Sequence, residues 1–123
     1  MKHSAGFLQL VEDARRRVHE VTVEEARARL AADPAARLID VREDNEWHAG
    51  RAAGAQHLGR GVIERDIETK HPDKTAELIL YCGGGYRSAL ACDNLQRMGY
   101  TNVHSLAGGW KAWRDAGAPV EGD

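Results

Sequence analysis

Segments with the character of buried strands alternate along this chain with segments of helical periodicity. Three short segments, 37–41, 78–81 and 102–106, predict strands, and residues 56–58 predict a further extended piece. Apolar residues at helical spacing predict helices over 7–18, 22–32, 45–49, 62–70, 88–98 and 110–116. This alternation indicates an α/β fold with a central, mainly parallel sheet and helices on both faces.

The first predicted helix carries an apolar stripe made of Phe7, Leu8, Val11, Ala14 and Val18. We interpret residues 1–19 as a helical extension that packs on a single domain over residues 20–123. A length of 123 residues with 42% hydrophobic residues fits one compact domain with its own core.

Charge and hydropathy exclude several functional classes. The formal net charge of −2 provides no broad basic field, so we expect no nucleic-acid partner. The short Arg15–Arg17 run is interpreted as part of a solvated helix face. No apolar run approaches the ~20 residues that span a bilayer, and no signal peptide is recognisable at Met1–Leu10, so we expect a cytoplasmic protein with no membrane partner.

The candidate chemistry lies at Cys82, where a predicted strand ends. Three glycines, Gly83, Gly84 and Gly85, lead from this cysteine into a predicted helix. Glycines allow backbone N–H groups to converge on one point, and the helix start adds its positive end. Both effects favour a thiolate, so Cys82 is a candidate nucleophile in an anion cradle, and Gly84→Val is expected to displace an amide from it. The structural alternative is a tight turn beside a buried cysteine.

The remaining cysteine and the histidines indicate neither a disulfide nor a metal site. Cys92 lies ten residues after Cys82, which corresponds to roughly 15 Å of rise if one helix carries both, too far for a disulfide. We therefore interpret Cys92 as a core residue. The six histidines are scattered without a metal-ligand spacing, so no metal is expected.

Four ordered segments resemble the rhodanese homology domain family, over about residues 20 to 118. These are Leu38–Glu43, the Glu46-Trp47 pair with Gly50 and Gly54-Ala55, the loop Cys82–Ser88, and Leu106–Trp113 with its Gly-Gly-Trp sequence. Where the family commonly has histidine and isoleucine after Gly50, this chain has Arg51 and Ala52. Four residues separate Cys82 from Arg87, whereas related phosphatases have five, and the smaller loop suits a single sulfur atom better than a phosphate group.

The resemblance implies a sulfurtransferase that works through a persulfide. The Cys82 thiolate would take sulfane sulfur from thiosulfate or a similar small anionic donor and pass it to cyanide, a thiol or a protein acceptor. The backbone N–H groups of Gly83, Gly84, Gly85, Tyr86, Arg87 and Ser88 would stabilise the anion. No metal or organic cofactor is implied, because the persulfide itself carries the transferred atom.

Other side chains near the loop have two readings each. Arg87 either binds the anionic donor or pairs with a nearby acid and shapes the loop. Tyr86 either screens the pocket or lies on the surface. Asp40 and Arg42, at the end of another strand, either act directly in catalysis or support the neighbouring loop, and we expect the supporting role, with Glu46 as a candidate partner for Arg42.

Two other function classes stay open at this point. One is a phosphatase or arsenate reductase, which shares the thiolate and the anion cradle. The other is a sulfur carrier or regulatory binding module that keeps the fold with negligible turnover.

Overall fold

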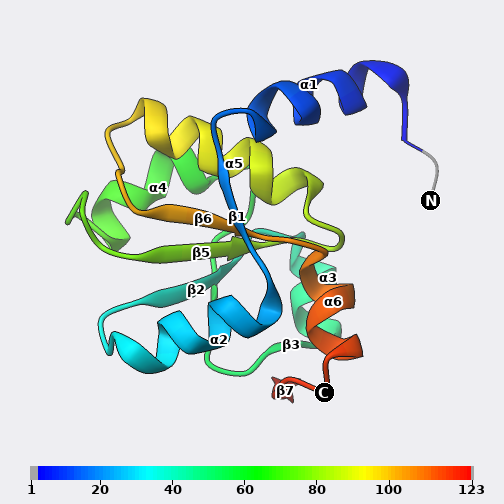
Figure 1. Cartoon of the computed structure of the whole chain (residues 1–123), viewed down its shortest axis with the longest axis vertical. Helices are drawn as coiled ribbons and strands as arrows, with labels where there is room; N and C mark the ends of the chain where they lie inside the picture. Colours follow the sequence, from blue (N-terminus) through cyan, green and yellow to red (C-terminus); the bar gives the residue numbers. More distant parts are fainter. Residues whose placement is uncertain (1–2, 123) are drawn as a thin grey trace.

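The structure, a computed structural model, is described for residues 3–122. Its elements in chain order are α1 (Ala5–Arg15), β1 (His19–Val21), α2 (Val23–Ala32), β2 (Arg37–Asp40), α3 (Asp44–Ala49), β3 (Arg51–Ala52), β4 (Gln56–His57), α4 (Ile63–Lys70), β5 (Leu78–Tyr81), α5 (Tyr86–Arg97), β6 (Val103–Leu106), α6 (Gly109–Asp115) and β7 (Val120–Glu121). Figure 1 shows α1, α4 and α5 above the central sheet and α2 and α6 below it. The predicted α/β fold class, with helices on both faces of a parallel sheet, is confirmed.

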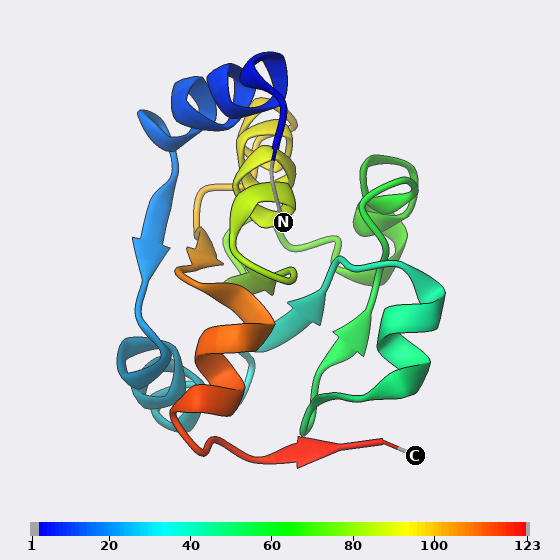
Figure 2. The ribbon, with the colours of Figure 1, turned by 90° about the vertical axis from the view of Figure 1, so that its right-hand side faces the viewer.

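The central sheet has five parallel strands in the order β1-β6-β5-β2-β4. Its middle strand, β5, is buried on both faces, which explains its continuous apolar run. Leu78 and Leu80 pack in the cluster that includes α4 and α5, whereas Ile79 and Tyr81 pack in the cluster with α2 and α6. All five strands end at one edge, which faces the viewer in Figure 2.

The sequence prediction missed three short strands. In β1 two of the three residues are exposed, so the segment shows no apolar run, and its backbone pairs with β6. Strands β3 and β7 form a separate antiparallel pair of two residues each, in which Arg51 lies opposite Glu121 and Ala52 opposite Val120. Such pairs depend on contacts between distant segments, which no local periodicity records.

Helix α1 packs on α5 through a short apolar face and polar anchors. Val11 and Ala14 are buried, whereas Leu8 of the predicted stripe is exposed. The Arg17 guanidinium donates hydrogen bonds of 2.9 and 2.8 Å to Asp93, and the Gln96 amide donates to the Arg17 carbonyl. Because Asp93 accepts these hydrogen bonds, its pKa lies below the ordinary value. The Arg15–Arg17 run is therefore not simply a solvated face, and a domain boundary after residue 19 stays a prediction.

The Arg17–Asp93 contact predicts a pH-dependent stability. Asp93→Asn should lower the free energy of unfolding by about 1–2 kcal/mol at neutral pH, because a mostly buried charged acceptor is lost. Since the folded-state pKa of Asp93 is depressed, the wild-type protein loses this stabilisation as pH falls below about 4, and the two proteins should converge there.

Urea unfolding at several pH values measures this difference. The control is Glu12→Gln, at an exposed α1 residue whose side chain makes no hydrogen bond or ion pair among residues 3–122. If the free energies of unfolding of wild type and Asp93→Asn differ by the same amount at pH 3 and pH 7, the ion pair is excluded as the cause of the difference.

Candidate active site

Cys82 lies directly after β5, at the carboxyl edge of the sheet, with 1% of its surface exposed. The backbone N–H of Gly85 points at its Sγ from 3.1 Å and that of Ser88 from 3.4 Å. The Ser88 hydroxyl lies 3.6 Å from Sγ and shares a hydrogen bond with Ser105. Two amides at the start of α5 thus direct the positive ends of their dipoles at the sulfur, an arrangement that stabilises an anion there.

The turn at Gly85 makes this convergence possible. Gly85 has φ +96° and caps α5 in the left-handed conformation, which side chains with a Cβ rarely adopt. Gly84 does not adopt the left-handed conformation, and a Cβ at this position would lie 3.4 Å from the Tyr86 ring, an ordinary contact. The expected effect of Gly84→Val on the loop amides stays a prediction, whereas the geometry shows that the amide of Gly85 contacts Sγ directly.

The start of α6 holds the loop from the opposite side. The N–H of Trp110 donates to the Cys82 carbonyl at 2.7 Å, and that of Lys111 donates to the Gly83 carbonyl at 3.2 Å. Gly109 has φ +54°, and a Cβ there would collide with the Cys82 carbonyl oxygen. The Gly-Gly-Trp sequence of the resemblance thus permits a close backbone approach. Because a trans peptide points its N–H away from its carbonyl, the N–H groups of Gly83 and Gly84 face away from α6.

Arg87 is paired with a carboxylate from another element. Its guanidinium donates to both oxygens of Glu46 on α3, at 2.8 and 3.2 Å. These hydrogen bonds lower the pKa of Glu46 and raise that of Arg87, so the pair is charged at neutral pH. Glu46 therefore pairs with Arg87, and the expected Arg42–Glu46 contact was wrong.

Asp40 and Arg42 form a buried network beside the loop. The Arg42 guanidinium donates to Asp40, with a shortest distance of 2.8 Å, and to the Gly50 carbonyl at 2.6 Å. The Tyr81 hydroxyl donates to Asp40 at 2.7 Å and accepts the N–H of Ala52. Burial raises the pKa of Tyr81, which keeps its hydroxyl protonated as a donor. This network joins β2, β5 and β3, and none of its hydrogen bonds reaches Cys82.

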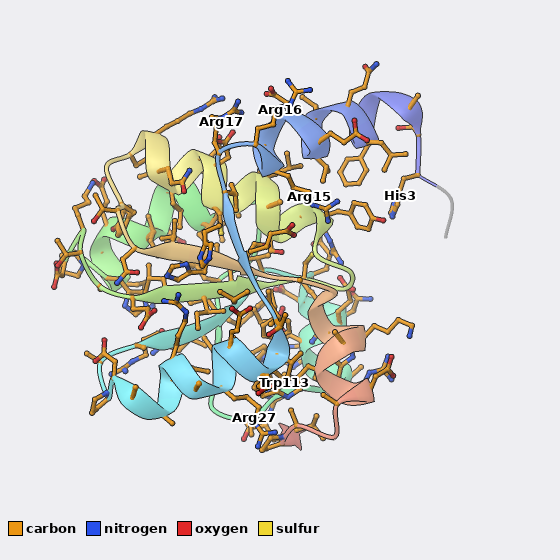
Figure 3. All side chains as sticks on the ribbon, viewed as in Figure 1. His3, Arg15, Arg16, Arg17, Arg27 and Trp113 are labelled. Carbon is orange, nitrogen blue, oxygen red and sulfur yellow. The ribbon has the colours of Figure 1, made fainter. Side chains whose placement is uncertain are left out.

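The Tyr86 ring packs against residues from the region of α1. Its ring centroid lies 4.5 Å from that of His3 and 6.2 Å from that of Phe7, and the Arg15 guanidinium lies 5.0 Å from it. Figure 3 shows Arg15 and His3 reaching from the α1 region toward the start of α5. The ring is therefore not free on the surface, because His3, Phe7 and Arg15 lie against it, and the reading in which Tyr86 screens the pocket stays a prediction.

Cys92 is buried in α5, as predicted for a core residue. Burial raises the pKa of its thiol, which stays protonated and unreactive at neutral pH. Within residues 3–122, no group of three or more His, Cys, Asp or Glu side chains could hold a metal ion. None of the helices described is long and apolar enough to cross a membrane.

Sequence reasoning missed one supporting residue and assigned another to the wrong partner. Ser105 on β6 orients the Ser88 hydroxyl, and no local signal marked it. Glu46 was recognised within a motif, but its partner Arg87 lies 41 residues away and could be assigned only in three dimensions.

The comparisons with known proteins agree with this geometry. A family model described as the rhodanese-like domain matches residues 22–116. A thiosulfate sulfurtransferase of Actinobacillus succinogenes is 33% identical over 105 residues, which cover 83% of this chain and 89% of the relative.

Two solved structures cover nearly all of the chain. The structure of the polysulfide-sulfur transferase homodimer of Wolinella succinogenes matches with a TM-score of 0.83 at 26% identity. The match covers 97% of this chain and 89% of the Wolinella chain. A Rhodopseudomonas palustris protein of unknown function, described as a possible tyrosine phosphatase, has a TM-score of 0.83 at 29% identity over 98% of both chains.

The loop geometry predicts different roles for two neighbouring glycines. Gly85→Ala should slow alkylation of Cys82 by iodoacetamide at neutral pH roughly tenfold, because strain at φ +96° displaces an amide that stabilises the sulfur anion. Gly84→Ala is the matched control and should change the rate less than about twofold. Peptide mapping by mass spectrometry assigns the alkylated cysteine. Equal rates in both variants would contradict the role given to the Gly85 amide.

Proposed function

This chain belongs to the rhodanese-like domain family, and from that membership we propose that it is a sulfurtransferase that carries sulfur as a persulfide on Cys82. One observation carries the proposal: two backbone N–H groups point at the buried Sγ from the start of α5. Such a site favours an anionic sulfur.

The first half-reaction loads the cysteine. The Cys82 thiolate attacks the outer sulfur of thiosulfate or a similar small anionic donor, and a new sulfur–sulfur bond forms. The donor's own sulfur–sulfur bond breaks, and with thiosulfate its electron pair leaves on sulfite. In the second half-reaction a nucleophilic acceptor (cyanide, a thiol or a protein thiolate) takes the outer sulfur and regenerates the Cys82 thiolate.

The loop backbone supports both states of the cysteine. The Gly85 and Ser88 amides contact Sγ, and the Gly83 and Gly84 N–H groups face away from α6 and are available to the outer sulfur. These dipoles are fixed before the reaction begins, so charge can develop on either sulfur without rearrangement of the loop. We assign no metal or organic cofactor to this chemistry, because the persulfide carries the transferred atom.

We assign supporting roles to the charged residues around the loop. Arg87 maintains the loop shape through Glu46, and its positive charge also favours an anionic donor. Asp40 and Arg42 are positioning residues, since their hydrogen bonds hold β2, β3 and the Gly50 carbonyl.

Mass spectrometry after incubation with thiosulfate tests the proposal. The wild-type protein and Cys92→Ser should each gain one sulfur atom, mapped to Cys82, whereas Cys82→Ser should gain none and lose transfer activity. The reason is that Cys92 is buried with a raised thiol pKa, so it cannot act as the nucleophile.

The same three proteins separate the alternative functions. Hydrolysis of an aryl phosphate without any sulfur gain on Cys82 would instead identify a phosphatase. A stable persulfide on Cys82 whose sulfur passes to none of the acceptors (cyanide, a thiol or a protein thiolate) would identify a sulfur carrier.

The Arg87–Glu46 pair predicts linked effects on the donor. Arg87→Ala should raise KM for thiosulfate by roughly tenfold and raise KM for an uncharged persulfide donor much less, because a charge-assisted contact with the anion is lost. Glu46→Gln keeps Arg87 but removes its charged partner. It should therefore raise KM for both donors to a similar extent, and by less than Arg87→Ala raises KM for thiosulfate. Steady-state kinetics with the two donors measures this. If Arg87→Ala affects both donors identically, Arg87 only shapes the loop.

A further inference from the structure

Two buried hydroxyls form a chain that ends at the Cys82 sulfur, and we call Ser88 and Ser105 the serine pair. The Ser88 Oγ lies 3.6 Å from Sγ, and the Ser105 Oγ lies 2.8 Å from the Ser88 Oγ. Both serines are 0% exposed. Ser105 lies on β6, below α5 in Figure 1, and all four residues of this strand are buried. Packing alone does not account for a polar side chain there, because burying a hydroxyl costs free energy unless it is hydrogen-bonded.

A negative charge on the sulfur satisfies both hydroxyl protons of the serine pair. A serine hydroxyl carries one proton and two lone pairs, whereas a thiolate only accepts hydrogen bonds. Among residues 3–122, the Ser105 hydroxyl bonds to Ser88 and to no other group. When Ser105 donates to Ser88 and Ser88 donates to a thiolate at Sγ, each proton has an acceptor.

A neutral thiol leaves the serine pair incompletely satisfied. If the Cys82 S–H donates to Ser88, then Ser88 donates to Ser105, and the Ser105 proton has no acceptor within the described chain, 3–122. If the pair keeps its first direction, Ser88 donates to a thiol sulfur, which is a weak acceptor. A buried donor without a good acceptor costs free energy in both arrangements. The serine pair therefore favours the thiolate over the thiol.

A persulfide differs from the thiolate in where its charge lies. Its negative charge lies on the outer sulfur, while Sγ is bonded to carbon and to that sulfur. The Ser88 hydroxyl contacts Sγ, so its hydrogen bond strengthens when the sulfur–sulfur bond breaks and charge returns to Sγ. An interaction that is stronger in the transition state than in the ground state accelerates the step in which it strengthens.

We propose that Ser105 is a positioning residue for sulfur delivery: it directs the Ser88 proton at Sγ, so that the pair stabilises the Cys82 thiolate as a leaving group. The inference rests on the proposed function and adds a residue outside the loop to it. An acceptor such as cyanide uses its own electron pair to bond to the outer sulfur. The sulfur–sulfur bond breaks, and its electron pair returns to Sγ. No oxidant, reductant or proton is consumed, because the two hydroxyls keep their protons.

Two other titratable groups near Sγ act independently of the serine pair. Hydrogen bonds to Glu46 raise the pKa of Arg87, and the charge of Cys82 raises it further, so this cation also favours the thiolate. Burial raises the pKa of Cys92, which stays a neutral thiol. Neither side chain hydrogen-bonds to the serine pair among residues 3–122, so Ser105→Ala leaves both in place.

Alkylation of Cys82 by iodoacetamide across a pH series tests the serine pair without any sulfur transfer. In Ser105→Ala the pH of half-maximal rate should rise by about one unit, because the Ser88 proton is no longer directed at the thiolate. The maximal rate at alkaline pH, where the thiol is fully ionised, should stay within about twofold of wild type. Equal slowing at every pH would overturn the proposal, since a displaced loop slows the reaction whatever the charge.

Cys92→Ala is the matched control for this series. It also removes one side-chain atom from a buried residue, in the same apolar cluster as Cys82. Because Cys92 makes no hydrogen bond to Sγ among residues 3–122, both the half-maximal pH and the maximal rate should match the wild-type values. A shift as large as that of Ser105→Ala would attribute the effect to lost packing and overturn the proposal.

A double-mutant cycle tests whether Ser105 acts through Ser88. Ser88→Ala should raise the half-maximal pH at least as much as Ser105→Ala does. Adding Ser105→Ala to Ser88→Ala should then change it by less than about 0.3 unit, because Ser105 has no hydroxyl left to direct. Two independent shifts that add would overturn the positioning role.

Single-turnover transfer measures the effect on the reaction itself. The Cys82 persulfide, formed with thiosulfate and freed of donor, should pass its sulfur to cyanide roughly tenfold more slowly in Ser105→Ala, and at the wild-type rate in Cys92→Ala. Unchanged transfer in Ser105→Ala would overturn the leaving-group role. A wild-type protein that forms no persulfide would refute the proposed function, whereas the alkylation series separately decides whether the serine pair favours the thiolate.

Discussion

The hydrogen bonds from α6 to the carbonyls of Cys82 and Gly83 are the constraint on which the site depends. They fix the orientation of the first two peptide groups of the loop, with donor–acceptor distances of 2.7 Å for the Trp110 N–H and 3.2 Å for the Lys111 N–H. With the carbonyls turned toward α6, the Gly83 and Gly84 amides are left for the opposite side, which is where we propose that the sulfur chemistry takes place. The approach is so close that a Cβ at Gly109 would collide with the Cys82 carbonyl, so this position requires glycine.

The rest of the fold keeps α6 and the loop in register. Strand β5 is buried on both faces and delivers Cys82 to the rim, while the neighbouring β2 ends at Asp40. From there the buried Asp40–Arg42–Tyr81 network reaches the Gly50 carbonyl and the Ala52 amide. Every polar group in such a network needs its partner, since a buried charge left unpaired costs about 3–5 kcal/mol. The rim is thus stiff because its polar groups satisfy one another.

The sequence predicted those features whose signal is local. The apolar run of β5 and the glycines after Cys82 identified the strand, the turn and the nucleophile candidate, and the helices were placed to within a few residues. Features that depend on distant pairs were missed or misassigned: the three-residue β1, the β3–β7 pair, and the partner of Glu46. The position of Tyr86 depended on α1, whose packing no residue near Tyr86 could reveal. The glycine run located the turn, but only the backbone angles distinguished Gly85 from Gly84.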